Sequence, residues 1–458
     1  MAQKKKYFGT DGIRGRFDVH PMTADFAKVF GAATVDWLVQ GGWSGSGRPT
    51  VLIGRDTRVS GTILEAAFAE GANLMGADVH FVGVIPTPGV AWLTVEEKGA
   101  VGVVISASHN PYHDNGIKLF GADGFKLADT QELAIEAKID QFLEAGIPAV
   151  AESGETTEDQ QAHYRYLEHL KGLWPATLSL EGKTLVVDGA HGAAYELGPM
   201  LFEALGATVH AIGVKPNGVN INEGSGALDP SGLQQAVLTH GAMAGLAFDG
   251  DADRLIVVDE KGQVVDGDQI MCICGPRLSN EDGSGADRVV ATVMSNMGLE
   301  LALKEHGLLL DRTAVGDKYV MERMRETQAL LGGEQSGHLI FLQHATTGDG
   351  LLAALKLMQF VMESGEALSA LAGEMSRFPQ ILRNVMIREK APWREIPSIL
   401  AAVEEAEAEL HGEGRVFVRY SGTENKARVM VEGKDQQQLE SLVERVAAVF
   451  EQELGLHS

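Results

Sequence analysis

The chain is poor in cysteine, in aromatic residues and in basic residues. Of its 458 residues only 2 are cysteines and 6% are aromatic, and 38 lysines and arginines face 63 aspartates and glutamates. The formal net charge of −25 disfavours nucleic acid and anionic membranes as partners, because like charges repel. A small anionic ligand remains compatible with this charge, since a local basic pocket can override the overall field.

The two cysteines are Cys272 and Cys274. On a strand, side chains two positions apart share a face, but they lie too far apart along it for good disulfide geometry. The sequence contains no second cysteine pair that could complete a zinc site. We therefore expect two buried apolar side chains.

Long apolar runs are missing as well. No stretch of about 20 apolar residues could form a transmembrane helix. Lys4, Lys5 and Lys6 are basic, but no apolar core follows them, so we expect no signal peptide. These features predict a soluble cytoplasmic protein in a reducing compartment.

Glycine, in contrast, is abundant, and strand-like and helix-like segments alternate. The predicted strands are 50–54, 79–84, 101–105, 183–188, 209–213, 245–248 and 289–293, and the predicted helices are 61–75, 131–145 and 299–306. Such alternation predicts mixed sheets covered by helices. The pattern restarts twice, which indicates three related α/β units.

The last part of the chain has a different character. A helix with a proline in its first turn (397–411), strands at 415–419 and 428–432 and a final helix at 436–454 predict a small α+β domain. A chain of this length is too long for one core. We expect the α/β class, with three related mixed-sheet α/β domains and a smaller C-terminal α+β domain: 1–155, 156–260, 261–372 and 373–458.

A polar turn follows the apolar strand 101–105. It contains Ser108 and His109 before the helix-stopping Pro111, and Lys118 follows on a short returning strand. A hydroxyl at the end of a strand is where α/β proteins often expose a reactive group. Adjacent side chains usually point apart, so His109 is not automatically the base. The alternative is a capped polar turn.

Three carboxylates follow the strand 245–248. Asp249, Asp251 and Asp253 would project to one side of an extended loop, where they would repel one another without a cation. Oxygen ligands select Mg²⁺ or a similar hard ion, and Arg254 follows directly. A nucleophile loop together with this metal loop indicates phosphoryl transfer. The alternative is a solvated acidic turn.

Three further loops have polar compositions that suit small ligands. One has the composition of an anion cradle: Arg419, Ser421, Gly422, Thr423 and Arg428. A second offers polar groups to sugar hydroxyls: Glu334, Ser336 and His338. The third places Arg14 in a glycine-rich turn. Taken alone, each of these could be an ordinary turn.

Together the motifs resemble the α-D-phosphohexomutase superfamily along essentially the whole chain. The order of the loops matches: 9–15, 106–111, 249–254, 333–338 and 419–424. Gln335 and the segment 217–222 resemble the glucosamine branch. Asn425 stands where the family usually has proline, and residues 224–230 also depart from that branch.

The resemblance implies four domains around a central cleft and a mutase that interconverts glucosamine 6-phosphate and glucosamine 1-phosphate for the amino-sugar nucleotide pathway. Ser108 would be phosphorylated, and its phosphate would join Asp249, Asp251 and Asp253 as ligands of one Mg²⁺ ion. A hexosamine or hexose 1,6-bisphosphate would serve as activator. Lys118 would be the first candidate for proton transfer and His338 the second.

The resemblance also implies further site residues. Arg14 and His109 would act near the transferring phosphoryl group, and substrate contacts would come from Arg254, Gly316 and Asp317 in addition to the sugar and phosphate loops. A phosphosugar is the expected partner, and the resemblance leaves room for a homodimer.

Three rival functions stay open at this point. A sister mutase would act on glucose or mannose phosphates. A phosphatase would use Asp249 as its nucleophile and would survive loss of Ser108. A binding protein without catalysis would hold the phosphosugar and not turn it over.

Overall fold

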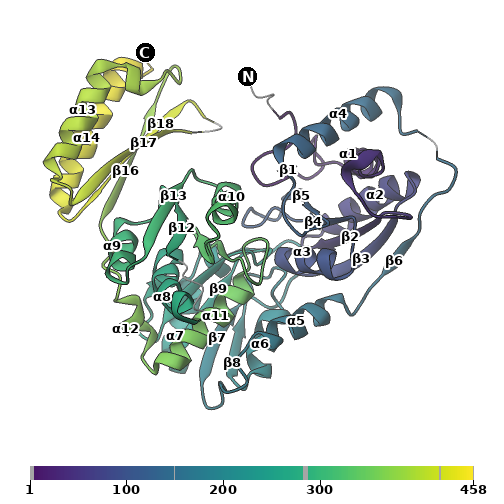
Figure 1. Cartoon of the computed structure of the whole chain (residues 1–458), viewed down its shortest axis with the longest axis horizontal. Coiled ribbons are helices and arrows are strands. Elements are labelled where there is room, and N and C mark those ends of the chain that lie inside the picture. Colours follow the sequence, from purple (N-terminus) through teal and green to yellow (C-terminus); the bar gives the residue numbers. More distant parts are fainter. Residues whose placement is uncertain (1–4, 149, 282–286, 422–423, 457–458) are drawn as a thin grey trace. The chain divides into compact units, whose positions relative to one another are not determined.

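The structure, a computed structural model, describes residues 5–148, 150–281, 287–421 and 424–456. Its contacts divide the chain into two compact units, 1–294 with 308–374 and 295–307 with 375–458. Figure 1 labels most of the helices and strands of both units. Among the described residues, no helix is long and apolar enough to cross a membrane.

The first unit contains three sheets. The order of the first is β1-β5-β4-β2-β3-β6, and β5 runs antiparallel to both of its neighbours. Its strands are β1 Ile13–Arg16, β2 Thr50–Arg55, β3 Asp78–Val84, β4 Val101–Ile105, β5 Asp114–Gly121 and β6 Thr156–Glu158. The helices of the unit are α1 Ala24–Trp37, α2 Gly61–Leu74, α3 Thr87–Glu96, α4 Asp129–Ala145, α5 Ala162–Gly172, α6 Leu197–Ala204, α7 Ser231–His240, α8 Gly267–Glu281, α10 Asp317–Thr327, α11 Gly350–Ser364 and α12 Leu368–Ala372.

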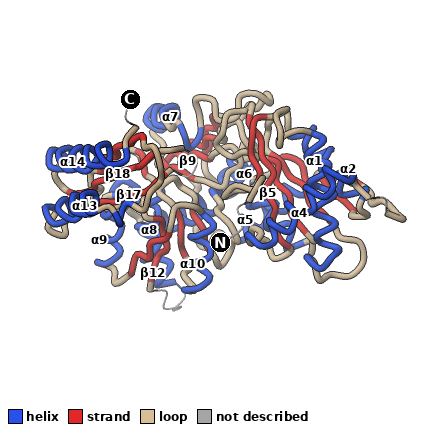
Figure 2. The backbone as a smooth tube through the Cα atoms, turned by 90° about the horizontal axis from the view of Figure 1, so that it is seen from above, coloured by secondary structure: helices blue, strands red, loops and turns tan. Residues whose placement is uncertain are grey.

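Strand β4 shows why this part of the sequence folds into layers. Val101, Val103 and Ile105 are fully buried in one core with residues of α1, α2 and α4. On the other face, a Cβ atom added at Gly102 would lie 2.2 Å from the Oγ1 of Thr94 on α3. Alternate residues of β4 therefore point to helices on opposite faces of the sheet. The helices α1 and α2 lie side by side in Figures 1 and 2.

The second and third sheets repeat the mixed pattern. Their orders are β11-β10-β9-β7-β8 and β13-β12-β14-β15. The strands are β7 Thr184–Asp188, β8 Thr208–Ile212, β9 Ala244–Phe248, β10 Leu255–Asp259, β11 Val264–Val265, β12 Arg288–Thr292, β13 Leu309–Thr313, β14 Leu331–Gly333 and β15 Leu339–Phe341.

The three predicted loops occupy the same position in their sheets. The serine loop joins β4 to the antiparallel strand β5, the metal loop joins β9 to the antiparallel β10, and the sugar loop joins β14 to the antiparallel β15. In each case a strand of the parallel part ends at the loop and the next strand returns beside it. This common arrangement agrees with the three related α/β units expected from the sequence.

The second unit is the smaller α+β part. Its antiparallel sheet has the order β16-β18-β17, formed by Gln380–Met386, Lys426–Gly433 and Gly414–Tyr420, respectively. Its helices are α9 Met297–Glu305, α13 Pro397–Glu409 and α14 Gln436–Leu454. Apolar side chains of the sheet pack against α13 and α14 in one core. Pro397 occupies the first turn of α13, as expected.

Two local expectations differ from the structure. Cys272 and Cys274 are buried, but they lie on helix α8 rather than on a strand. An apolar run such as 270–274 does not by itself distinguish a buried strand from a buried helix. The polar segment expected to separate the first two domains contributes β6, which pairs with β3 at the edge of the first sheet. The four domain boundaries stay a prediction.

Candidate active site

Ser108 lies at the end of a strand that is buried along its whole length. The side chain is 1% exposed, and its hydroxyl donates a 2.6 Å hydrogen bond to Asp249 Oδ2. The backbone has φ of 51°, in the left-handed region, so the turn departs from the alternation of a strand. His109 Nδ1 consequently lies 3.3 Å from the Ser108 hydroxyl. The expectation that the two neighbouring side chains point apart is therefore wrong.

His109 is held in its neutral form in this position. Burial, together with the nearby charges of Arg254 and Arg14, lowers its pKa to about 4. A neutral imidazole carries one N–H and one unprotonated nitrogen, so the tautomer decides whether Nδ1 donates to the Ser108 oxygen or accepts from it. The structure thus places a neutral ring, rather than a cation, beside Ser108.

The metal loop brings its three carboxylates together. Asp249, Asp251 and Asp253 are buried, and each offers an oxygen atom such that the three atoms lie within 4.8 Å of one another. Burial, together with the charges of Asp253 and Asp251, raises the pKa of Asp249 to about 8. In the part of the chain that the structure describes, Asp251 Oδ1 and Asp253 Oδ1 accept no hydrogen bond. This oxygen-only group therefore fits a hard divalent cation, which would relieve the repulsion.

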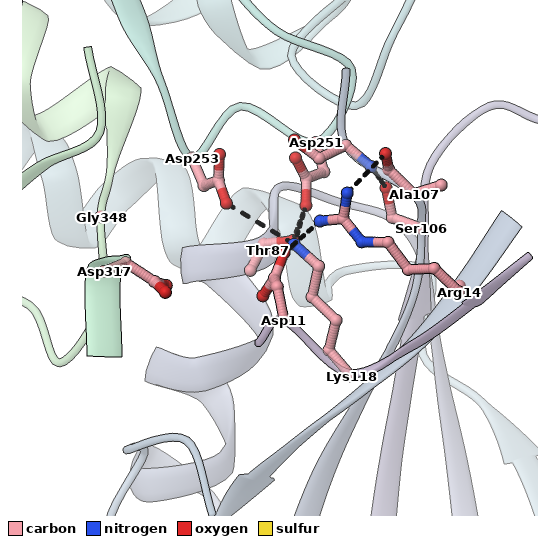
Figure 3. A network of polar contacts seen from close by, with 12 residues as sticks. Asp11, Arg14, Thr87, Ser106, Ala107, Lys118, Asp251, Asp253, Asp317 and Gly348 are labelled. Atoms are coloured by element: carbon pink, nitrogen blue, oxygen red, sulfur yellow. Dashed lines mark hydrogen bonds and ion pairs between the residues drawn. The ribbon is translucent and has the colours of Figure 1, made fainter. Parts of the chain in front are cut away.

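Lys118 neutralises part of the same group. It is 1% exposed on β5, and its Nζ atom lies 2.8 Å from Asp251 Oδ2, 3.0 Å from Asp11 Oδ2 and 3.5 Å from Asp253 Oδ2. Burial opposes the charge of the amine, but these carboxylates outweigh it and raise the lysine's pKa above the ordinary value. Figure 3 shows Lys118 pointing toward them.

Arg14 approaches the serine loop from β1. Its Nη1 donates to the carbonyl of Ala107 at 3.3 Å, and its Nη2 forms an ion pair with Asp11 (Figure 3). Asp11 lowers the cost of burying the guanidinium beside the loop. The arginine expected near the phosphoryl group is thus beside the reactive serine.

The sugar loop reaches the metal loop through His338. This side chain is 3% exposed, and its Nδ1 lies 3.6 Å from Asp253 Oδ2. The backbone N–H of Gly348 donates to Nε2 at 3.1 Å, so the ring proton of the neutral form is on Nδ1, facing Asp253. The N–H of Gly316 donates to Glu334 Oε1 at 3.2 Å.

Some of these groups line a cavity of about 400 Å³ within the first unit, whereas Ser108, Lys118, Asp249 and Asp251 are not among its lining residues. Most of the sequence-predicted residues of the first unit line it: Arg14, His109, Asp253, Arg254, Gly316, Asp317, Glu334 and His338. Ser336 does not. It is exposed, because Gly337 turns the chain and leaves the serine at the tip of the loop.

Several residues of the site were not predicted. Asp11 forms ion pairs with Arg14, Lys118 and Lys126, and Lys126 also pairs with Asp317. Thr87 donates a 2.5 Å hydrogen bond to Asp251 Oδ2. Asp11 lies inside the glycine-rich motif that identified Arg14 and could have been found there. Lys126 and Thr87 carry no local signal, because their partners are more than 100 residues away.

The phosphate loop belongs to the second unit. Arg419 on β17 and Arg428 on β18 occupy directly opposite positions in the antiparallel pair. Burial and the charge of Arg428 lower the pKa of Arg419. Like charges in opposite positions are unfavourable, and an anion bound to both would remove that cost. Ser421 is buried at the end of β17, whereas Gly422 and Thr423 lie outside the described residues.

Models of four domains of one protein family match the chain in order. They are described as phosphoglucomutase/phosphomannomutase alpha/beta/alpha domains I, II and III, matched at residues 5–145, 164–262 and 266–378, and the C-terminal domain of the same family, matched at residues 382–449.

Known proteins of similar length match as well. A phosphoglucosamine mutase of Anaeromyxobacter dehalogenans is 49% identical, with 98% of this chain and 100% of the relative covered. One of Syntrophotalea carbinolica is 47% identical, with 99% of each covered. A crystal structure of a phosphoglucomutase/phosphomannomutase family protein from Burkholderia thailandensis has a TM-score of 0.79 at 24% identity and covers 97% of each chain, which supports the fold. The chain belongs to the phosphoglucomutase/phosphomannomutase family and, within it, to the phosphoglucosamine mutases.

Proposed function

We propose that the chain interconverts glucosamine 6-phosphate and glucosamine 1-phosphate through a phosphorylated Ser108. The observation that carries this proposal is the 2.6 Å hydrogen bond between the Ser108 hydroxyl and Asp249, within a buried group of three carboxylates. A buried hydroxyl beside a site suited to a divalent cation is what reversible phosphoryl transfer requires. The family and its similar relatives support the same reaction.

The reaction has two transfers of the same kind. In the first, the bond between phosphorus and Ser108 Oγ breaks, a bond to O1 of glucosamine 6-phosphate forms, and the proton of that hydroxyl leaves to a base. The resulting 1,6-bisphosphate then reorients in the site, so that its 6-phosphoryl group faces Ser108. Its 6-phosphoryl group then returns to Ser108 and leaves glucosamine 1-phosphate.

The metal loop would hold one Mg²⁺ through Asp249, Asp251 and Asp253, together with an oxygen of phosphorylated Ser108. When bound, the ion would offset negative charge on the transferring group. A hexosamine or hexose 1,6-bisphosphate would phosphorylate Ser108 and so activate the enzyme.

The remaining side chains have proposed roles that follow their positions. Lys118 is the first candidate for proton transfer and His338 the second, since both lie against the metal loop. Arg14, His109 and Arg254 would act near the phosphoryl group at Ser108.

The sugar loop and the phosphate loop have separate proposed roles. Glu334, Gly316 and Asp317 would bind sugar hydroxyls. Arg419, Arg428 and the loop between them, including Ser421, Gly422 and Thr423, would bind the phosphate that is not reacting. A homodimer stays a prediction.

The test is a coupled assay of glucosamine 1-phosphate formation with Mg²⁺ and a trace of hexose 1,6-bisphosphate. Turnover that exceeds the rates on glucose and mannose phosphates, and that Ser108→Ala abolishes, is the expected result. Faster turnover of glucose or mannose phosphates would assign the chain to a sister activity. Release of inorganic phosphate by the Ser108→Ala variant would indicate a phosphatase that uses Asp249, and binding without turnover would indicate a non-catalytic protein.

A further inference from the structure

Asp56 and Arg58, just after β2, form a buried ion pair that belongs to none of the five motifs. Both side chains are 0% exposed. Arg58 Nη2 donates to the carbonyl oxygen of Ser108 at 3.0 Å and to that of Asn110 at 2.6 Å. Nη1 of the same guanidinium pairs with Asp56. A single planar fork therefore holds two carbonyls of the serine loop.

Asp56 fixes the backbone N–H of Ser108 through the hydroxyl of Ser106. The hydroxyl of Ser106 donates to Asp56 Oδ2 at 2.6 Å, and the backbone N–H of Ser108 donates to Ser106 Oγ at 2.9 Å. The backbone N–H and C=O of Ser108 are thus both tied, directly or through one hydroxyl, to the Asp56–Arg58 pair. Such a network is rigid because every link lies in a buried environment of low dielectric.

The conformation held in this way is an unfavourable one. Ser108 has φ of 51°, and the left-handed region is unfavourable for a residue other than glycine. It persists only if the surroundings fix it. The consequence at the reactive atom is specific, since this backbone geometry turns the hydroxyl toward Asp249 at 2.6 Å.

Asn222 supports the loop from a second segment of the chain. Its Nδ2 donates to the carbonyls of Ser108 and Asn110 at 3.0 and 3.3 Å, the same two oxygens that Arg58 contacts. The metal loop also passes close by: a Cβ atom added at Gly250 would lie 2.4 Å from the Ser108 carbonyl oxygen. The serine carbonyl is therefore enclosed by groups from three segments.

We propose that Arg58 is a positioning residue for phosphoryl transfer. Held by Asp56, it fixes the left-handed conformation of Ser108 and thereby aims the phosphorylated oxygen at the metal loop during both transfers. This inference rests on the mutase function proposed above. Arg58 itself contacts the backbone of the loop and not the reacting atoms.

The test compares the Arg58→Met variant with the wild-type enzyme. Each rate is divided by the fraction of molecules whose Ser108 becomes phosphorylated. Ser108 phosphorylation after incubation with hexose 1,6-bisphosphate is counted by intact mass, and kcat, KM and the single-turnover rate of transfer to sugar are measured. We expect kcat and the transfer rate to fall about 100-fold, because a displacement of about 1 Å costs that much, with KM changed less than about threefold. Arg58→Lys should recover only part of the rate, since an ammonium group cannot reproduce the fork.

Arg55→Met is the matched control. Arg55 lies in the same segment and pairs with Glu65 at 2.9 Å, and within the described part of the chain its side chain forms no hydrogen bond or ion pair with the serine loop. Its loss should lower thermal stability without lowering kcat per folded molecule. A purely structural role for Arg58 would give the same pattern in both variants.

Asn222→Ala keeps the proposal testable if Arg58→Met does not fold, because Asn222 is only half-buried and contacts the same two carbonyls. We expect its kcat to fall about tenfold at unchanged KM. Normal kcat per folded molecule in either variant overturns the positioning role while wild-type mutase activity stands. A wild-type enzyme that is inactive on all hexose phosphates would overturn the proposed function, and the positioning role with it.

Discussion

Replacing Lys118 by methionine should destabilise the protein when divalent cations are absent and much less when they are present. The lysine is 1% exposed and has three carboxylates within 3.5 Å. Removing one partner of such a buried network leaves uncompensated charge and costs about 3–5 kcal/mol. At about 2 °C per kcal/mol for a large unit, the unfolding midpoint in EDTA falls by about 6–10 °C.

Saturating Mg²⁺ should restore most of this loss. A cation bound by Asp249, Asp251 and Asp253 supplies the positive charge that the variant lacks, so the Mg²⁺-induced increase in midpoint should be larger in Lys118→Met than in wild type. Catalytic activity should remain low in both conditions, because methionine cannot carry a proton. The assay is thermal unfolding in EDTA and in Mg²⁺, followed by a turnover measurement.

Lys318→Met is the matched control for this prediction. Lys318 pairs with Asp129, whose side chain is 60% exposed, and exposed pairs contribute about 1 kcal/mol or less. Its midpoint should change little, with or without Mg²⁺. An EDTA midpoint of Lys118→Met equal to that of wild type would refute the compensating role of Lys118. A loss that Mg²⁺ does not reduce would refute the assignment of the metal loop.

Two further predictions concern the phosphate loop and the pH dependence of stability. Arg419→Ala should raise the KM for phosphosugar about 10–100-fold, since a charged hydrogen-bond pair contributes about 1.5–3 kcal/mol. Arg383→Ala, at an exposed position of the same sheet, should leave KM unaltered. An unaltered KM in Arg419→Ala would reject the anion cradle. Burial raises the pKa of Asp349 from 3.8 to about 6. Because the folded pKa of Asp349 exceeds the unfolded value, its contribution to the free energy of unfolding is greatest below pH 4. That contribution falls by about 3 kcal/mol as the pH rises through 6. Asp349→Asn should remove that component, so the unfolding free energies of variant and wild type, measured by urea titration, should diverge between pH 4 and 7; a constant difference would contradict it.

The loops could be predicted from the sequence because their chemistry is local. Ser108 and the metal loop each follow a short apolar strand, and that order is visible without a structure. The return of β5 beside β4 was also predicted, since Lys118 was expected on a short strand after the serine turn. What the pattern could not give is which oxygen Lys118 contacts, because that depends on two loops separated by more than 130 residues.

The supporting residues could not be predicted for the same reason. Arg58 and Lys126 resemble ordinary surface cations in sequence. Only the fold brings Arg58 to the carbonyls of Ser108 and Asn110, and Lys126 to Asp11 and Asp317. Ser336 is a different case. Its side chain is exposed beside Gly337 and does not line the cavity, so its contact with the sugar stays a prediction. Composition identifies a loop more reliably than it identifies which side chains of the loop face the cavity.

The acidity of the chain becomes informative once the cavity is known. Its lining holds four carboxylates, of Asp11, Asp253, Asp317 and Glu334, against the guanidinium groups of Arg14 and Arg254. Lys118 and Lys126 pair with these carboxylates, but Asp249 and Asp251 of the metal loop add two more, so six carboxylates face four cationic side chains. The first unit therefore presents a formal surplus of negative charge to a substrate that is itself an anion. Affinity must depend on positive charge added to this cavity, and the metal loop is the site suited to supply it.

This reasoning predicts that phosphosugar binding is coupled to the cation. Calorimetric titration of glucosamine 6-phosphate into the Ser108→Ala enzyme, which cannot turn over, should show at least about tenfold tighter binding in Mg²⁺ than in EDTA, a coupling of about 1.4 kcal/mol or more. By reciprocity, the sugar should tighten Mg²⁺ binding by the same factor. Raising the salt concentration serves as a control. If only the net charge of the protein mattered, salt would weaken sugar binding equally in Mg²⁺ and in EDTA, whereas a cation held by buried carboxylates is screened little and keeps most of the difference in affinity. Equal affinity in Mg²⁺ and EDTA would mean that the carboxylate surplus of the cavity is neutralised by some other group.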